Sequence, residues 1–315
     1  FRNVTGVQTC ALPISGQYTL KAARVPRPLP TAGPTAGMTT IEVSGPGGMM
    51  MGMSTSGLSG LPAAPPIPPE PTLWASMPVT VDDADVTGLA VPVRTGLKVS
   101  GRVQFEGTRP APPPDQVQRI NLTLQSIEGR SPGLATAVRI DGDGRITTGG
   151  FIPGLYQVIA NVPATTGFQQ LFVAPSPWVL KSAAVNGRNV SDDPVEIQSE
   201  DISGLVVTFT DRPSELGGAV ADKNAEVVIF PADSTSWKTG FALARRVRST
   251  RVSQSGTYLF TNVPIGDYYA VALAQDSTGD PQDPKFLERL VSVATRVTVG
   301  DGEKKTQDLV AKAVK

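Results

Sequence analysis

One pattern occurs three times along this chain of 315 residues, and it constrains the fold more than any other feature. A glycine, a variable residue and a tyrosine stand at the head of an apolar segment at residues 16–20, 154–158 and 266–270. Each copy is followed by a second shared element, which is Asp-x-x-Gly-Leu at 85–89 and 201–205 and a shorter form at 307–310. Recurrence of such units along a chain predicts tandem domains.

Short segments in which apolar and polar residues alternate follow one another along most of the chain. Residues 97–105 and 120–124 show this period-two pattern, which is typical of half-buried strands. Such segments recur about every eight to twelve residues between turn residues. Only residues 283–290 have apolar residues at the spacing of a helix. The pattern predicts an all-β chain made of sandwiches or barrels.

The repeats also predict the domain boundaries. The Asp-x-x-Gly-Leu element and its shorter form at 307–310 end each module, and we call them the closing segments. The first two are followed at once by the first strand of the next module, the opening strand, so boundaries are expected near Thr95 and near Arg212. The chain then contains two complete modules, at 96–212 and 213–315, and a partial one at 16–95.

The partial module at 16–95 is expected to be the closing half of a truncated domain. Its residues 25–78 are rich in Pro, Gly and Met and predict a disordered insertion. Strands are expected at 16–23, 79–81 and 87–93. Because so few strands are marginal alone, we expect the region to be poorly ordered or to dock on the next module near Leu89, Val91 and Val93.

The first fifteen residues differ from the rest of the chain. Residues 4–14 read VTGVQTCALPI and resemble the translation of a sequencing adapter in one reading frame. We interpret residues 1–15 as an artefact and the gene as truncated upstream, so that a missing signal peptide is uninformative. A genuine N-terminal tail is the alternative. On the first interpretation Cys10, the single cysteine, is not native.

Composition excludes several classes of function. The chain has no histidine, so neither a Ser-His-Asp nor a Cys-His nucleophile system can form, and a histidine zinc site is excluded. With Cys10 discounted, disulfides and thiol catalysis are excluded too. Lys plus Arg equals Asp plus Glu, 28 against 28, which argues against nucleic-acid binding. No apolar run reaches the length of a transmembrane helix.

Further motifs connect the two complete modules. Ser-Gly-Arg-Val at 100–103, Asp-Gly-Arg-Ile at 143–146 and Ile-Pro-Gly-Leu-Tyr-Gln-Val at 152–158 occur in this order, and similar segments recur at 217–220, 255–258 and 263–269. Together they resemble the carboxypeptidase regulatory-like domain over about residues 96–315. The resemblance implies tandem Greek-key β-sandwiches of the transthyretin-like or immunoglobulin-like kind, a fold also classed as carbohydrate-binding-like. It carries no peptidase activity, because the ligands of that zinc enzyme would require histidine.

The Gly-x-Tyr motif has a physical interpretation. Glycine permits a tight turn, and the proline that precedes it in two copies fixes φ at the entry to the turn. The tyrosine is expected to bury its ring at the edge of the sandwich while its hydroxyl bonds to a loop carbonyl, as in a tyrosine corner.

Charged candidates for chemistry are few. Asp141-Gly142-Asp143-Gly144 has the start of a calcium loop, but the later glutamate is missing, and a hairpin turn is favoured. The pairs Asp192-Asp193 and Glu200-Asp201 could do glycosidase-type work, but we interpret them as solvated loops. Arg245 to Arg248, continued by Arg251, is interpreted as the solvent face of a strand. No catalytic residue, metal site or cofactor is predicted.

The tryptophans are the remaining candidates for ligand binding, because a flat aromatic ring suits the apolar face of a pyranose. Trp74 and Trp178 precede corresponding strands, which indicates packing. Trp237 is expected to be exposed in a loop. The candidate ligand-binding residues are therefore Trp237 and, less strongly, Trp178.

These observations predict a non-catalytic tandem β-sandwich of a secreted or cell-envelope protein, located extracellularly, in the periplasm or at the cell surface. Its expected role is a spacer, with an envelope protein or a polysaccharide as partner. Two alternatives stay open. The chain can be the accessory region of a larger enzyme whose catalytic domain lies upstream, or an interaction or adhesion module that uses exposed strand edges.

Overall fold

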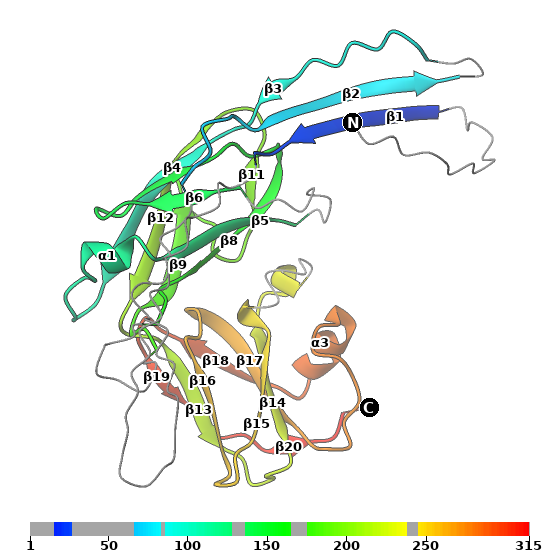
Figure 1. Ribbon diagram of the computed structural model, residues 1–315. Helices are drawn as coiled ribbons and strands as arrows, with labels where there is room; N and C mark the ends of the chain where they lie inside the picture. Colours follow the sequence, from blue (N-terminus) through cyan, green and yellow to red (C-terminus); the bar gives the residue numbers. More distant parts are fainter. Residues whose placement is uncertain are drawn as a thin grey trace, which may run out of the picture.

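The computed structural model describes residues 16–26, 66–82, 86–127, 136–164, 175–237 and 245–314. They form three bodies of β-structure that follow one another along the chain (Figure 1). A three-stranded sheet, the ribbon, projects from one end; the first sandwich spans residues 99–210 and the second 215–312. The predicted fold class, all-β with tandem sandwiches, is confirmed. The adapter-like residues 1–15 and residues 27–65 of the insertion lie outside the described residues.

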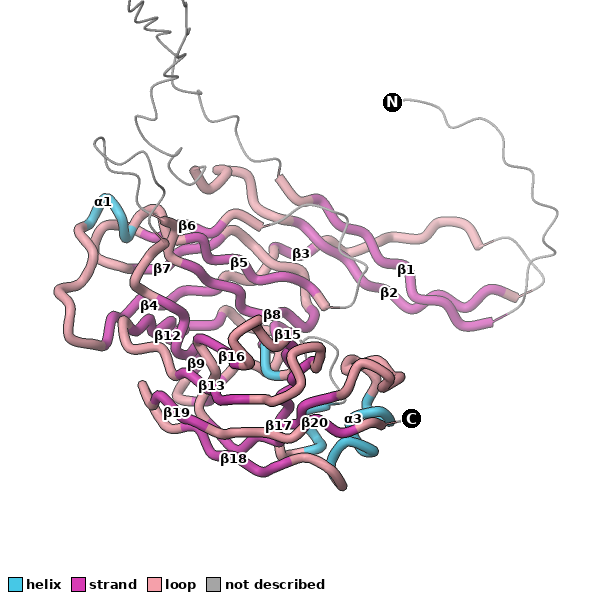
Figure 2. Tube along the Cα trace, turned by 90° about the horizontal axis from the view of Figure 1, so that it is seen from below, coloured by secondary structure: helices cyan, strands magenta, loops and turns pink. Residues whose placement is uncertain are grey.

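The ribbon consists of β1 (Gly16–Arg24), β2 (Leu73–Val81) and β3 (Arg94–Thr95). β1 and β2 pair antiparallel over all nine residues. Partners across a ladder point to the same side of the sheet, so Tyr18, Leu20, Met77 and Val79 share one apolar face. Among the described residues, no ribbon residue belongs to a hydrophobic core cluster, and Tyr18 is 47% exposed. Figure 2 shows the ribbon from below, projecting from the first sandwich.

Two expectations for this region are wrong. The disordered insertion does not extend to residue 78, because residues 73–78 pair with β1. The segment 87–93 forms no strand. Of the two alternatives for this region, docking is not found at Leu89 and Val93, which are exposed, whereas Val91 is partly buried. Gly88 has a φ of 71° and Pro92 has no N–H, and both features disfavour a continuous ladder there.

The first sandwich has one sheet in the order β10-β9-β12-β4-β7-β6 and a second in the order β11-β8-β5. Its strands are β4 (Val99–Glu106), β5 (Asn121–Ser126), β6 (Val138–Ile140), β7 (Arg145–Thr148), β8 (Gly154–Asn161), β9 (Val179–Val185), β10 (Arg188–Asn189), β11 (Val195–Ile197) and β12 (Ile202–Thr210). One short helix, α1 (Pro114–Val117), lies between β4 and β5. Alternate residues of these strands, such as Leu205, Val207 and Phe209 of β12, fill the core.

The second sandwich has sheets in the orders β16-β13-β19 and β15-β14-β17-β18, with β20 paired to β17. Its strands are β13 (Glu215–Ala219), β14 (Glu226–Pro231), β15 (Arg248–Arg251), β16 (Thr257–Thr261), β17 (Gly266–Leu273), β18 (Thr295–Val299), β19 (Lys304–Thr306) and β20 (Ala311–Lys312). The predicted helix is confirmed as α3 (Pro284–Val291). Asp283 caps it by accepting a hydrogen bond of 3.0 Å from the backbone N–H of Lys285.

The central strands of the second sandwich are buried on both faces. Val227 and Ile229 of β14 point into the core between the sheets, whereas Val228 and Phe230 point to a second cluster on the outer face. That second cluster is covered by α3, whose Phe286, Leu287 and Leu290 are buried. This explains why residues 227–230 are continuously apolar rather than alternating.

The glycines of the opening strands permit close approach of the closing segments. β4 pairs parallel with β12, and β13 pairs parallel with β19. A Cβ on Gly101 would lie 1.8 Å from the carbonyl oxygen of Leu205, and one on Gly218 would lie 2.1 Å from that of Gln307. The Ser-Gly-Arg-Val and Gly-Gly-Ala-Val motifs therefore mark the junction of opening and closing segments.

Aspartates of the closing segments also accept hydrogen bonds from the backbone of the opening segments. The Oδ1 atom of Asp201 accepts a hydrogen bond of 2.8 Å from the N–H of Lys98. The Oδ1 atom of Asp308 accepts one of 2.8 Å from the N–H of Ala219. This shared contact gives a physical role to the repeated aspartate.

The expected tyrosine corners are present in both sandwiches. Tyr156 is 7% exposed and its hydroxyl donates to the carbonyl of Ile152 at 2.7 Å. Tyr268 is fully buried and donates to the carbonyl of Pro264 at 2.7 Å. Each bond reaches four residues back and so closes the loop that precedes the strand.

Candidate functional site

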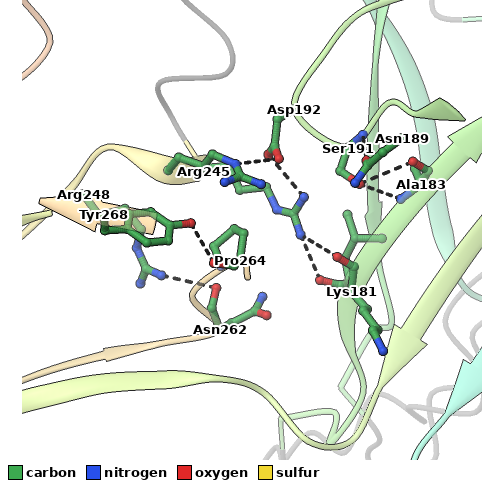
Figure 3. A network of polar contacts seen from close by, with 12 residues as sticks. Lys181, Ala183, Asn189, Ser191, Asp192, Arg245, Arg248, Asn262, Pro264 and Tyr268 are labelled. Atoms are coloured by element: carbon green, nitrogen blue, oxygen red, sulfur yellow. Dashed lines mark hydrogen bonds and ion pairs between the residues drawn. The ribbon is translucent and has the colours of Figure 1, made fainter. Parts of the chain in front are cut away.

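An ion-pair cluster joins the two sandwiches, and we call it the clamp (Figure 3). Asp192, in the loop after β10, accepts from Arg245 at 3.3 Å and from the Nε atom of Arg246 at 2.7 Å. Arg245 also donates through Nη2 to the backbone carbonyls of Leu180 and Lys181, at 3.2 and 3.0 Å. One carboxylate of the first sandwich thus holds two guanidinium groups of the second.

The clamp is largely shielded from water. The side chains of Asp192, Arg245 and Arg246 are only 15%, 20% and 20% exposed. Burial lowers the pKa of Arg245, and the nearby charge of Asp192 opposes this effect. Charge pairs shielded in this way are screened by salt much less than pairs on the open surface.

Lys181 makes a second, more exposed contact between the sandwiches. Its Nζ atom lies 2.8 Å from Glu106 of the first sandwich and 2.8 Å from Asp301 of the second. Hydrogen bonds to Asp301 and then Glu106 raise the pKa of Lys181, so the ammonium stays charged. Exposed pairs of this kind are worth about 0–1 kcal/mol each. The clamp is therefore the better shielded of the two contacts.

The clamp corrects two interpretations made from sequence. Asp192 is not in a solvated loop, and Arg245 and Arg246 do not form the solvent face of a strand, because β15 begins only at Arg248. The sequence itself contained a signal against the second interpretation. Successive residues of a strand point to opposite faces, so the adjacent arginines 245 and 246 could not both face solvent on one strand.

Neither candidate tryptophan presents an open ring. The expected exposure of Trp237 is wrong: the residue is 4% exposed, packs edge-on against Phe230 and donates from Nε1 to the carbonyl of Pro231 at 2.9 Å. Trp178 is 6% exposed and packs edge-on against Phe105. Trp74, in β2, is half-buried beneath Arg94. The rings of Trp178 and Trp237 fill the hydrophobic cores of the two sandwiches.

A cleft of about 500 Å³ lies beside the clamp, and we call it the junction cleft. The first sandwich contributes three residues and the second contributes the remainder. The lining residues are Asn189, Asp192, Asp193, Pro231, Ala232, Asp233, Ser236, Arg246, Asp267, Tyr269 and Arg296. The pair Asp192-Asp193 was considered above for glycosidase-type chemistry. In the cleft it lies together with Asp233 and Asp267, which are distant in sequence.

The carboxylates of the junction cleft are held by neighbours. Hydrogen bonds from Thr298 and Arg296 keep the pKa of Asp267 below its usual value. The side chain and backbone of Thr235 do the same for Asp233. A glycosidase needs one carboxyl group with a raised pKa as general acid, and the shifts of these two groups have the opposite direction.

The other charged candidates are structural. Asp141 accepts hydrogen bonds from the N–H groups of Asp143 and Arg145 in the tight turn between β6 and β7, which confirms the hairpin interpretation. The Glu200-Asp201 pair precedes β12, where Asp201 bonds to Lys98. Among the described residues, no group of three or more acidic, Cys or His side chains could hold a metal ion. No helix in the described ranges is long and apolar enough to cross a membrane.

No family model and no curated protein matches the chain. Among solved structures, a Streptococcal ancillary pilin is similar at 12% identity over 77% of this chain and 76% of that one, with a TM-score of 0.25. GBS52, the minor pilin of Streptococcus agalactiae, is similar at 13% identity, covering 70% and 97%, with a TM-score of 0.25. The Bacillus anthracis TIE protein is similar at 12% identity with a TM-score of 0.22; the match covers 76% of this chain but only 41% of that one.

Proposed function

We propose that the chain is a non-catalytic spacer of a secreted or cell-envelope protein, in which two β-sandwiches are held at a fixed orientation. The observation that carries the proposal is the junction between them. It combines the clamp around Asp192 with the separate bridge through Lys181. Two attachment points restrict rotation between domains more than one does, and a rigid pair can present flanking domains at a set distance.

The absence of catalytic chemistry is part of the proposal. The chain has no histidine, and the aspartates 192, 233 and 267 of the junction cleft are held by arginine or threonine partners. These contacts suit a positioning role better than acid–base work.

We also propose that the chain is related to the carboxypeptidase regulatory-like family. Its motifs have defined structural roles here: Gly101 and Gly218 admit the closing segments, and Tyr156 and Tyr268 close the corners. We propose an extracellular, periplasmic or cell-surface location, with an envelope protein or a polysaccharide as partner.

A second role, protein interaction by strand addition, is favoured by the ribbon. Within the described residues, the outer edge of β1 has no strand paired to it. An exposed edge nine residues long presents backbone donors and acceptors to an incoming strand.

The spacer proposal is tested by the distance between the sandwiches. Spin labels at Arg139→Cys on β6 and Glu288→Cys on α3, both exposed positions, are introduced in a Cys10→Ser background. We expect a narrow distance distribution that broadens strongly when Asp192→Ala and Lys181→Ala are combined. The control is Asp193→Ala, the exposed neighbour, which should leave the distribution narrow. A distribution as broad in the parent protein as in the double variant would contradict a fixed orientation.

A further inference from the structure

We propose that the junction cleft binds an uncharged, hydroxyl-rich ligand, namely a saccharide. The inference deepens the polysaccharide part of the proposed function by giving it a site. That site is not the predicted tryptophans, whose rings are buried. It lies where the first sandwich supplies Asn189, Asp192 and Asp193 and the second supplies the facing wall.

The charges on the walls select the class of ligand. Four carboxylates, those of Asp192, Asp193, Asp233 and Asp267, line the cleft together with the guanidinium groups of Arg246 and Arg296. An anion would meet the carboxylates, and a cation would meet the arginines, so a charged ligand has a like charge close by wherever it lies. A hydroxyl group both donates and accepts, and can therefore bond to either kind of wall.

Hydrogen-bonding capacity remains available in the cleft. Arg246 uses Nε for Asp192, and its two terminal nitrogens make no hydrogen bond within the described residues. The side chain is 80% shielded from solvent and lines the cleft. The carboxylates use only part of their acceptor capacity, since an ionised carboxylate can accept about four hydrogen bonds.

Tyr269 supplies an aromatic surface. One part of its ring packs against Phe230, with the centroids 5.5 Å apart, and the residue also lines the cleft. A fixed ring beside fixed polar groups suits the apolar C–H face of a pyranose. The tyrosine hydroxyl makes no hydrogen bond to any other described residue and is a further donor and acceptor.

The site is preorganised and of suitable size. Asp192 is fixed by two arginines, Asp233 by Thr235 and Asp267 by Arg296 and Thr298. Groups held before binding lose little conformational entropy when the ligand arrives. A volume of about 500 Å³ lies within the range of about 300–1,000 Å³ typical of small-molecule pockets.

The test is a titration of the full chain with matched sugars, followed by backbone amide NMR. The neutral probes are glucose, galactose, maltose and cellobiose, and the charged probes are glucosamine and glucuronate. We expect at least one neutral probe to shift amides of Asn189, Asp193, Asp233 and Tyr269, and to bind more tightly than either charged probe. Failure of every neutral probe to shift these amides, or tighter binding of a charged probe, would overturn the proposal.

Two variants locate the binding. Tyr269→Leu keeps an apolar group against Phe230, leaves every ion pair of the junction in place and should weaken binding about tenfold, the loss expected for one aromatic contact. Asp193→Ala, at an exposed position, should also weaken binding, while Tyr18→Leu on the ribbon should not. Unchanged affinity in both cleft variants would place the ligand elsewhere and overturn the proposal. A broad spin-label distance distribution would contradict the spacer proposal, whereas unchanged affinity in the two cleft variants would contradict the saccharide site. The two proposals are therefore tested by different measurements.

Discussion

The ribbon and the two sandwiches each contain the Gly-x-Tyr motif at the head of a strand, but they differ in what the tyrosine does. In the sandwiches, Tyr156 and Tyr268 are buried and bond to a carbonyl four residues upstream. In the ribbon, Tyr18 stands on an apolar face and is 47% exposed. The motif therefore specifies a strand in all three places. A buried corner is found only in the two copies that belong to a sandwich with a hydrophobic core.

The closing segments show the same difference. Residues 202–210 form β12 alongside β4, and Leu309 forms a bridge to Val220. In the first closing segment, by contrast, the described residues 86–91 do not form a strand. A closing segment pairs parallel with an opening strand of its own sandwich, and among the described residues the ribbon contains only antiparallel strands.

The largest expected effect separates the buried from the exposed tyrosine. Tyr268→Ala should lower the free energy of unfolding by about 3–5 kcal/mol, because it removes a buried ring and a hydrogen bond. Tyr18→Ala should change it by no more than about 0.5 kcal/mol. Urea denaturation monitored by circular dichroism measures both. A similar loss in the two variants would mean that the ribbon is as tightly packed as the sandwiches.

Alkaline pH should destabilise the second sandwich. Burial raises the pKa of Tyr258 and of Tyr268 to about 12 from 10.0. A folded-state pKa above the unfolded value gives stability that is complete below about pH 10 and is lost as pH rises towards 12. For the fully buried Tyr268 the loss is about 2–3 kcal/mol.

Urea midpoints at pH 9, 10, 11 and 12 check this expectation, with tyrosinate absorbance recorded in parallel. Replacement of both residues by Phe should flatten the fall in stability between pH 10 and 12. An equally steep fall in the double variant would show that other groups cause it.

A smaller effect is expected at the glycines. Gly101→Ala places a Cβ 1.8 Å from a backbone carbonyl and should cost about 1–3 kcal/mol, because the closing strand must move. Gly16→Ala is the matched change in the ribbon, where the nearest atom is a flexible ring carbon at 3.6 Å. It should be neutral within about 0.5 kcal/mol. Thermal melts of the two variants provide the comparison, and equal melting temperatures would refute the role given to Gly101.

The sequence predicted strands and turns well where the pattern was local. The alternation at 97–105, the turn at 141–144 and the helix at 283–290 all depend on residues close in the chain. β2 was mostly missed, because Pro and Gly around it suggested disorder, whereas its pairing with β1 depends on partners that lie far away in the sequence, from Arg24 with Leu73 to Gly16 with Val81. Tertiary pairing overrode local composition.

The candidate site could not be predicted to the same extent. The clamp joins Asp192 to arginines more than fifty positions later, and nothing in a single sequence shows which charges of two domains meet. Trp237 was placed in an exposed loop because it lies among polar residues, yet it covers the outer face of β14 beside Phe230. Its burial follows from a second core that local patterning does not reveal.

Hydrogen exchange on the whole chain tests the contrast between the ribbon and the sandwiches most directly. Amides of β1 are compared with those of β4 and β17 under native conditions and in increasing urea. We expect β1 to exchange through local opening, much faster than the two core strands, since a few strands without a covered apolar face are marginally stable. Equal, strong protection of all three strands, lost together in one cooperative step, would show that the ribbon is an integral part of the folded domain and would contradict the account.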